Sequence, residues 1–309
     1  MKKPVYHRKI IRAGQSVLVS FTYPTRFGDD ITRKNAKSGL GTPADVEEYN
    51  YYLATRKLTA ILNENFSPDD WFITCHYEKE NRPDNIKKAK YQLSVFCKKL
   101  KEAFLENGCE EEFRWVKTTA FGERGALHHH IVIPKGISQR KISNLWKETV
   151  KASNKARPPE CRALYDTGEY SSLAAYFCQQ ADKSGVKEKN MRRFTCSRNI
   201  KKPIEEAPKV VNEIRWKEPP TPWPGYYIDT DSIRAGCNPI TGRPYLFYQM
   251  LRFKENFSCY TESGKKLTGA EAVKYYRKNN KEYIKQNWFK LNPEGEVIFK
   301  TDVGVKQNE

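Results

Sequence analysis

Three of the five histidines in this 309-residue chain are consecutive, His128 to His130, within the run ALHHHIVI. The run is rich in strand-forming residues, and alternate side chains of a strand point to the same face of a sheet. His128 and His130 are therefore expected on one face, with His129 on the other. Two imidazoles at this spacing can bind one divalent cation. Ordinary hydrogen-bonded sheet histidines are the alternative interpretation.

The run SSLAAYFCQQADK predicts a helix that carries Tyr176, with Gln179, Gln180 and Lys183 on or near the same helical face. A phenol has a pKa of about 10 and is a weak nucleophile unless a metal ion or a cation activates its target. Tyr176 is accordingly a candidate nucleophile. The alternative is a helix tyrosine that is half buried against a sheet.

A basic segment follows this helix, KNMRRFTCSRNIKK at residues 189–202, and it contains no acidic residue. Such uncompensated charges can bind the phosphates of a nucleic acid, and a solvated basic loop is the alternative. The candidate DNA-binding residues are Lys189, Arg192, Arg193, Arg198, Lys201 and Lys202.

The composition agrees with an anionic partner, because 55 Lys and Arg against 37 Asp and Glu give a formal charge of +18. Residues 1–202 carry +15 of this charge, so the anion-binding surface is expected in the first two-thirds of the chain. No run approaches the roughly 18 to 20 apolar residues that a membrane helix needs, which argues against membrane insertion. The eight cysteines lie singly, without a CxxC pair, and indicate reduced thiols in the cytoplasm.

Periodicity and helix-start signals predict an α+β fold in the order helix, strand, helix, hairpin, helix, helix. Local connections of this kind favour an antiparallel sheet that is covered by helices on one face. The expected elements are a helix from Thr42-Pro43 up to Asn63, a strand at 71–77, a helix from Pro83-Asp84, strands at 114–121 and 126–133 joined by GERG, and helices after Ser138 and Thr167. The proline-rich PPTPWPG at 219–225 predicts a stiff connector.

Taken in order, FITCHY, ERGALHHHIVI, LAAYFCQQADK and RRFTCSRNIKKP resemble the HUH endonucleases, the Rep proteins that initiate rolling-circle replication of plasmids and small single-stranded DNA phages. The resemblance covers roughly residues 45–250, since NPITGRPYLFYQM resembles a segment after the nuclease core. It implies an RRM/ferredoxin-like domain whose antiparallel sheet carries the His-x-His pair. A helix opposite that pair presents a tyrosine, which attacks a DNA phosphate and leaves a 5′-phosphotyrosine and a free 3′-hydroxyl.

The resemblance implies that His128 and His130 bind a divalent metal, Mg²⁺ or Mn²⁺, and that Tyr176 is the catalytic nucleophile. The chain also departs from the family pattern. Ala120 stands where the family has a carboxylate ligand, and Gln179 stands where it has a lysine. A metal ligand and a positive charge are therefore missing from their usual places, or are supplied by other residues.

Two residues are expected to supply them. Lys183, one helical turn beyond the glutamine, can bring a positive charge to the same region. His76 stands where the family has a threonine, and it shares a strand face with Phe72 and Thr74. If that strand pairs with the histidine strand, His76 is a third metal ligand. The alternatives are a His76 without a ligand role and an oxygen ligand from Glu123.

The function expected from these residues is replication initiation by metal-dependent nicking and rejoining of single-stranded DNA. The alternatives are a DNA-binding protein that has lost cleavage, and an HUH relaxase or transposase. Expected partners are single-stranded or hairpin origin DNA and, because the chain has no phosphate-binding loop ending in Gly-Lys-Ser/Thr, a host helicase with its polymerase in the bacterial cytoplasm. The predicted division is an N-terminal extension and helix at 1–65, the nuclease domain at 66–205 and an α+β region of unassigned role at 206–309.

Overall fold

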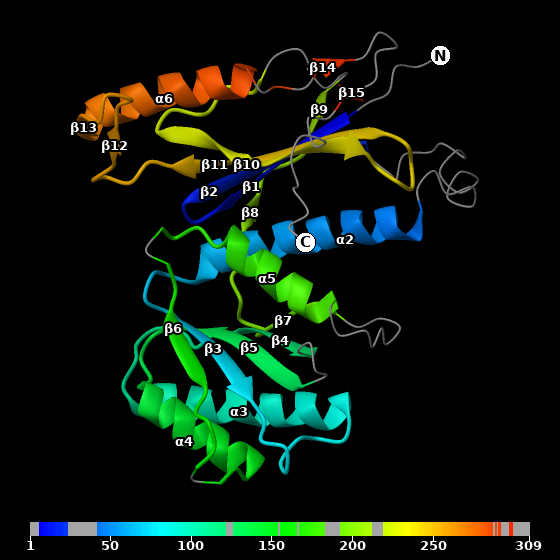
Figure 1. The fold of residues 1–309 in the computed structure, drawn as a ribbon, viewed down its shortest axis with the longest axis vertical. Coiled ribbons are helices and arrows are strands. Elements are labelled where there is room, and N and C mark those ends of the chain that lie inside the picture. The colour runs from blue at the N-terminus through cyan, green and yellow to red at the C-terminus, as the bar shows by residue number, and fades with distance from the viewer. Residues whose placement is uncertain are drawn as a thin grey trace. The chain divides into compact units, whose positions relative to one another are not determined.

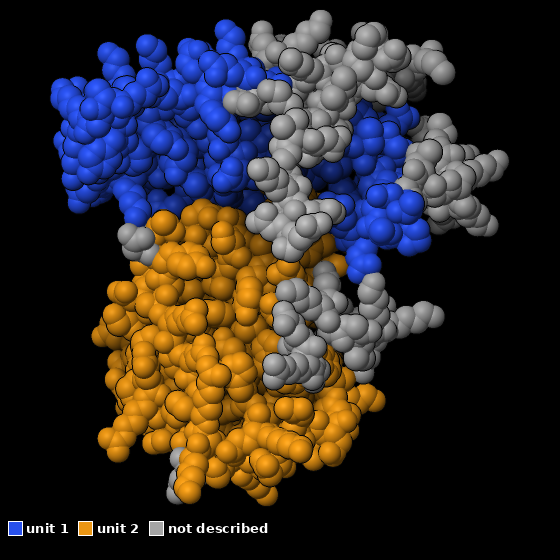
Figure 2. All heavy atoms as spheres, in the orientation of Figure 1, with its two compact units in different colours: residues 1–49, 204–309 blue, residues 50–203 orange. Residues whose placement is uncertain are grey.

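The structure is a computed structural model that describes residues 6–23, 42–121, 126–153, 155–165, 167–182, 192–211, 219–286, 288, 290–291 and 297–298. The chain forms two compact units, residues 1–49 with 204–309 and residues 50–203 (Figure 2). Both units combine antiparallel strands with helices, which confirms the predicted α+β class. In the described ranges, no helix is both long and apolar enough to cross a membrane.

The unit of residues 50–203 is built on a five-stranded antiparallel sheet in the order β6-β3-β5-β4-β7 (Figure 1). The strand at its centre, β5, has all seven of its side chains buried. Two of the predicted strands are confirmed closely, and the third begins at Val116 instead of Arg114. The strands are β3 (Trp71–His76), β4 (Val116–Phe121), β5 (Leu127–Ile133), β6 (Glu160–Ala163) and β7 (Thr195–Cys196).

Helices cover both faces of this sheet, so the prediction of helices on one face is wrong (Figure 1). On one face, α3 (Ile86–Glu106) and α4 (Gln139–Val150) pack on Ile131 and Ile133. On the other, α5 (Ser171–Asp182) and the second half of α2 (Pro43–Asn65) pack on Val132. The reason is that β5 carries apolar side chains on both of its faces, and each face must be removed from water.

Local signals at the helix ends behave as short-range chemistry predicts. Ser138 caps α4 by accepting a hydrogen bond from the backbone N–H of Lys141 at 3.2 Å. Asn85 caps α3 in the same way, accepting from the N–H of Lys88 at 2.9 Å. This second helix therefore begins after Asn85, slightly later than the Pro83-Asp84 start that the sequence suggests.

The other unit contains a six-stranded antiparallel sheet in the order β10-β11-β2-β1-β8, with β9 also paired to β1. Its N-terminal hairpin, β1 and β2, is joined to the C-terminal part of the chain because β2 pairs along β11. The strands are β1 (Tyr6–Ala13), β2 (Ser16–Thr22), β8 (Ile204–Glu205), β9 (Lys209–Val211), β10 (Tyr226–Cys237) and β11 (Pro244–Arg252).

The end of α6 (Gly269–Gln286) packs on one face of this sheet, through Ile284 in a cluster with Val19 and Tyr248. The short pairs β12 (Ser258–Tyr260) with β13 (Lys266–Thr268), and β14 (Lys290–Leu291) with β15 (Val297–Ile298), complete the described elements. The three-part division made from sequence stays a prediction. The β2–β11 pairing adds a link that the division does not contain.

Candidate active site

The register of the sheet places the candidate histidines in neighbouring rows on one face. In the antiparallel pairing of β3 with β5, His76 lies opposite His128 and Thr74 lies opposite His130. On the other side of β5, Ala120 of β4 also lies opposite His128. Directly opposed residues share a face. His76 and Ala120, two of the three departures from the family pattern, are therefore the two cross-strand neighbours of the same histidine.

The rings on this face are close together. The ring centroids of His128 and His130 are 4.8 Å apart, and those of His76 and His128 are 5.8 Å apart. The main chain of His76 is itself fixed, because the indole N–H of Trp146 in α4 donates a hydrogen bond to its carbonyl oxygen at 2.9 Å. The conditional expectation that β3 places His76 next to the His-x-His pair thus holds in the structure.

The hydrogen bond of His128 determines which of its ring nitrogens is free. Nδ1 lies 3.2 Å from the carbonyl oxygen of Ala126, and a carbonyl can only accept, so Nδ1 carries the proton. Nε2 then has a free lone pair. This tautomer is the one that a metal ligand needs.

His130 is buried, with 1% of its surface exposed, and one of its ring nitrogens has no partner. Nδ1 lies 3.1 Å from the hydroxyl oxygen of Thr74, whereas Nε2 makes no hydrogen bond. Desolvation, followed by the neighbouring His128 and His76, lowers the pKa of His130 to about 3, so the ring is neutral near pH 7. A buried polar atom without a partner costs about 1–3 kcal/mol. This cost is typical of a position that receives a ligand.

Tyr176 of α5 lies over the histidine face. Its ring centroid is 5.0 Å from that of His130 and 6.2 Å from that of Phe72. The next residue, Phe177, is fully buried against the same two rings and so fixes the helix above the sheet. Tyr176 is 38% exposed, and desolvation raises the pKa of its phenol. The structure therefore brings together a solvent-accessible phenol and the free nitrogens of two histidines.

Residues 70–184 match the model of one protein family, described as replication-associated protein ORF2. The matched segment contains the three site histidines and Tyr176. The match supports a role in replication initiation. Comparisons with curated proteins and with solved structures found no match.

The site offers a metal ion two ready nitrogen donors. Among the residues that the structure describes, no three His, Cys, Asp or Glu side chains are arranged to hold a metal ion. The unpartnered Nε2 of His130 and the free Nε2 of His128 fit the demands of a divalent cation, with water or DNA phosphate oxygens completing its coordination. A role for His76 as a third ligand stays a prediction, as does metal binding itself.

Gln179 is exposed on α5, one turn from Tyr176. Lys183, the residue expected to supply the missing charge, lies outside the described residues, and so do Lys189 and Glu123. Sequence reasoning missed β6, which pairs with the outer edge of β3 and adds Glu160 and Arg162 to the histidine face. No sequence signal identifies a four-residue strand such as ECRA, because its pairing partner is distant in the chain.

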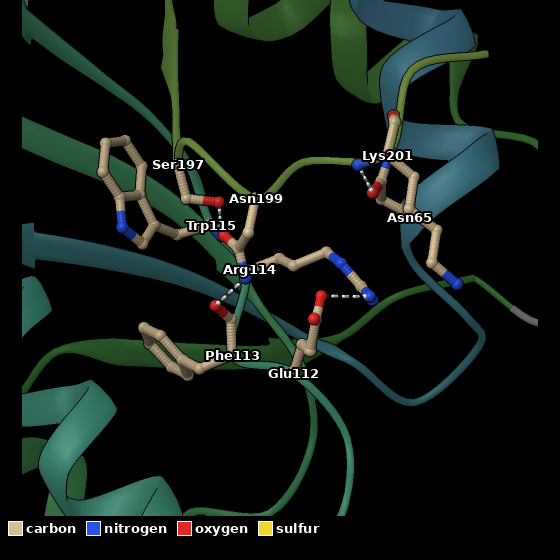
Figure 3. Close-up of polar contacts among 8 residues, drawn as sticks. All are labelled: Asn65, Glu112, Phe113, Arg114, Trp115, Ser197, Asn199 and Lys201. Carbon is tan, nitrogen blue, oxygen red and sulfur yellow. Dashed lines mark hydrogen bonds and ion pairs between the residues drawn. The ribbon is translucent and has the colours of Figure 1, made fainter.

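The described part of the basic segment, residues 192–202, is held by a series of hydrogen bonds to two other parts of its unit (Figure 3). Ser197 accepts from the N–H of Trp115 at 3.2 Å, and the side chain of Asn199 donates to the carbonyl of Phe113 at 3.1 Å. Further along, the side chain of Asn65 both accepts from the N–H of Lys201 at 2.7 Å and donates to its carbonyl at 2.8 Å.

These contacts fix the backbone that carries the predicted DNA-binding residues. Arg192, Arg198, Lys201 and Lys202 are exposed, and among the described residues no carboxylate forms an ion pair with any of them. Arg193 is half-buried, with its guanidinium 6.0 Å from the ring of Tyr51. A rigid backbone with exposed, unpaired cations is suited to binding phosphates.

Proposed function

We propose that this protein starts rolling-circle replication by nicking and rejoining single-stranded DNA through Tyr176. The observation that carries the proposal is the position of the Tyr176 ring, 5.0 Å from a buried His130 whose Nε2 has no partner. The family match to replication-associated proteins over residues 70–184 supports the biological role. The net positive charge of the chain supports DNA as the substrate.

In the proposed reaction, the phenol oxygen of Tyr176 attacks the scissile phosphorus. The bond from phosphorus to the 3′-oxygen breaks as the tyrosine–phosphorus bond forms, which leaves a 5′-phosphotyrosine. The phenol proton passes to solvent, and the leaving oxygen takes up a proton to become the 3′-hydroxyl that primes synthesis. Attack of that hydroxyl, or of another, on the phosphotyrosine reverses these bonds and rejoins the strand.

The histidine face would hold the divalent metal, Mg²⁺ or Mn²⁺, through Nε2 of His128 and Nε2 of His130, with His76 as the third ligand. When bound, the metal polarises the phosphate and stabilises its developing negative charge. A set of imidazole ligands favours Mn²⁺ over Mg²⁺, since nitrogen donors suit the former better. His130 supports this assignment because it is neutral and its free nitrogen is protected from water.

The exposed cations of residues 192–202 would bind backbone phosphates of single-stranded or hairpin origin DNA. A host helicase would unwind the template and a host polymerase would extend the 3′-hydroxyl. A second function, DNA binding without cleavage, is favoured by one observation. Ala120 lies opposite His128 and provides no oxygen ligand there.

A covalent-capture assay separates the two functions. The protein is incubated with a random pool of single-stranded oligonucleotides in Mn²⁺, and denaturing gels are examined for a protein–DNA adduct. We expect an adduct with wild type and none with Tyr176→Phe, while Tyr91→Phe, a matched change at an exposed tyrosine on α3, behaves as wild type. If wild type and Tyr176→Phe both bind the pool in native gels but neither forms an adduct, the nicking function is wrong and the binding function is supported.

A further inference from the structure

The edge strand β6 contributes charged side chains to the histidine face. In its antiparallel pairing with β3, Glu160 lies opposite Thr74 and Arg162 lies opposite Phe72. Directly opposed residues share a face. Because Phe72 also contacts the ring of Tyr176, the register brings Arg162 to the side of the site where the tyrosine lies. Figure 1 shows β6 running along the open edge of β3.

Glu160 holds two arginines at once. Its Oε2 is 3.3 Å from a guanidinium nitrogen of Arg162, and its Oε1 forms an ion pair with Arg157. The side chains of these arginines are 73% and 70% exposed. Each guanidinium has several N–H donors, and one carboxylate cannot accept from all of them. The group therefore retains a net positive charge and free donors that face solvent.

The electrostatic effects on neighbouring groups give the group a direction. After desolvation, Arg162 is the next contributor to the pKa of Tyr176 and lowers it, whereas Glu160 raises it. Arg157 acts on His76 instead, and lowers the pKa of that imidazole. Arg162 thus faces the tyrosine side of the site and Arg157 faces the histidine side.

We propose that Arg157 and Arg162, held by Glu160, form a phosphate-binding subsite for single-stranded DNA beside Tyr176. We call these three residues the β6 clamp. The proposal deepens the proposed function, on which it rests for its substrate. The clamp supplies positive charge next to the nucleophile where Gln179 supplies none. Paired guanidinium groups suit this task, since their planar forks can each bind two phosphate oxygens.

The first test measures DNA binding without chemistry. In a full-length Tyr176→Phe background with EDTA, the probe is a fluorescent fifteen-nucleotide oligothymidylate, and its affinity is measured over a range of salt concentrations. We expect Arg162→Gln and Arg157→Gln each to weaken binding several-fold and to reduce the slope of log K against log salt by about 0.7. Arg162→Lys should keep most of the slope, since it keeps the charge.

The matched control is Arg140→Gln on α4, an exposed arginine on a helix that packs on the opposite face of the sheet. It should leave affinity and slope close to those of the background protein. If Arg162→Gln and Arg157→Gln bind oligothymidylate as Arg140→Gln does, the β6 clamp is not a phosphate subsite.

The second test needs neither DNA nor metal. 3-Fluorotyrosine is placed at position 176, and its ionisation is followed by fluorine NMR. Arg162→Gln should raise the pKa of this phenol and Glu160→Gln should lower it, because each removes a charge that acts on it. An unchanged pKa in Arg162→Gln would overturn the placement of the arginine. If both tests succeed while wild type forms no covalent adduct, the clamp stands and the nicking function fails.

Discussion

Two adjacent histidines of β5 are both buried, and they differ in how their ring nitrogens are used. On the α3 and α4 face, His129 is completely buried, with Nδ1 3.0 Å from the hydroxyl oxygen of Thr119 and Nε2 2.8 Å from that of Tyr77. On the α2 and α5 face, His130 has only one nitrogen partnered and the other is without a hydrogen bond. The comparison teaches that burial does not distinguish a structural histidine from a functional one, whereas the number of satisfied nitrogens does.

The largest effect is expected at the histidine with the free nitrogen. We expect His130→Ala to reduce the rate of adduct formation by about 10³-fold, because a ligand of the phosphate-polarising metal is lost. Its free energy of unfolding should change by no more than about 1 kcal/mol, since the substitution also removes an unpartnered buried nitrogen. Rates on denaturing gels and urea unfolding measure the two quantities. Normal adduct formation by this variant would end the functional assignment of His130.

His129→Ala tests the other half of the comparison. It should lower the free energy of unfolding by about 2–4 kcal/mol, because it opens a cavity and leaves the hydroxyls of Tyr77 and Thr119 without their partner. Urea unfolding followed by tryptophan fluorescence measures this loss. Below the unfolding transition, the variant should still form the adduct. A stable His129→Ala protein with no activity would reverse the roles given to the two histidines.

The pH dependence of stability provides a third test, made on metal-free protein. The pKa of His130 is about 3 when folded, and that of an unfolded histidine is about 6.5. The folded protein therefore binds fewer protons, so the stability is fully present above pH 6.5 or so and is lost as the pH falls toward 3. Between pH 7 and pH 5 this costs about 2 kcal/mol at His130. Urea unfolding of His130→Gln should show a correspondingly smaller loss, and an equal loss would contradict the assignment.

The smallest effect concerns His76. If it is the third metal ligand, His76→Ala should weaken Mn²⁺ binding about tenfold, as measured by calorimetric titration of the DNA-free protein. His7→Ala, at a histidine in the other unit, serves as the matched control and should bind Mn²⁺ as wild type does. Equal affinities in wild type and His76→Ala would leave His128 and His130 as the only protein ligands of the proposed site.

The sequence predicts the parts of this molecule that depend on short-range chemistry. The cap at Ser138, the alternation that separates His129 from its neighbours and the helix that carries Tyr176 all follow from residues close together in the chain. The pairing of β3 beside β5 was reached only as a condition, yet its outcome places His76 opposite His128.

The remaining features depend on contacts that no local pattern records. Arg162 reaches the site only because the short strand β6 pairs with β3. The coverage of both sheet faces depends on which helix packs on Val132 and which packs on Ile131, and both residues look equally apolar in the sequence. The position of Ala120 as a neighbour of His128, in contrast, could be expected once the hairpin of β4 and β5 was assumed.

The pairing of β2 with β11 has a consequence for how the chain is made. Strand β2 emerges from the ribosome early, but its partner, residues 246–251, is translated only after the whole of residues 50–203. Chains are synthesised at about 5–20 residues per second, so the histidine–tyrosine unit can fold while translation continues. The N-terminal hairpin must wait for the end of synthesis with one edge unpaired. A nascent chain of this protein would thus acquire its reactive centre before it acquires its first sheet.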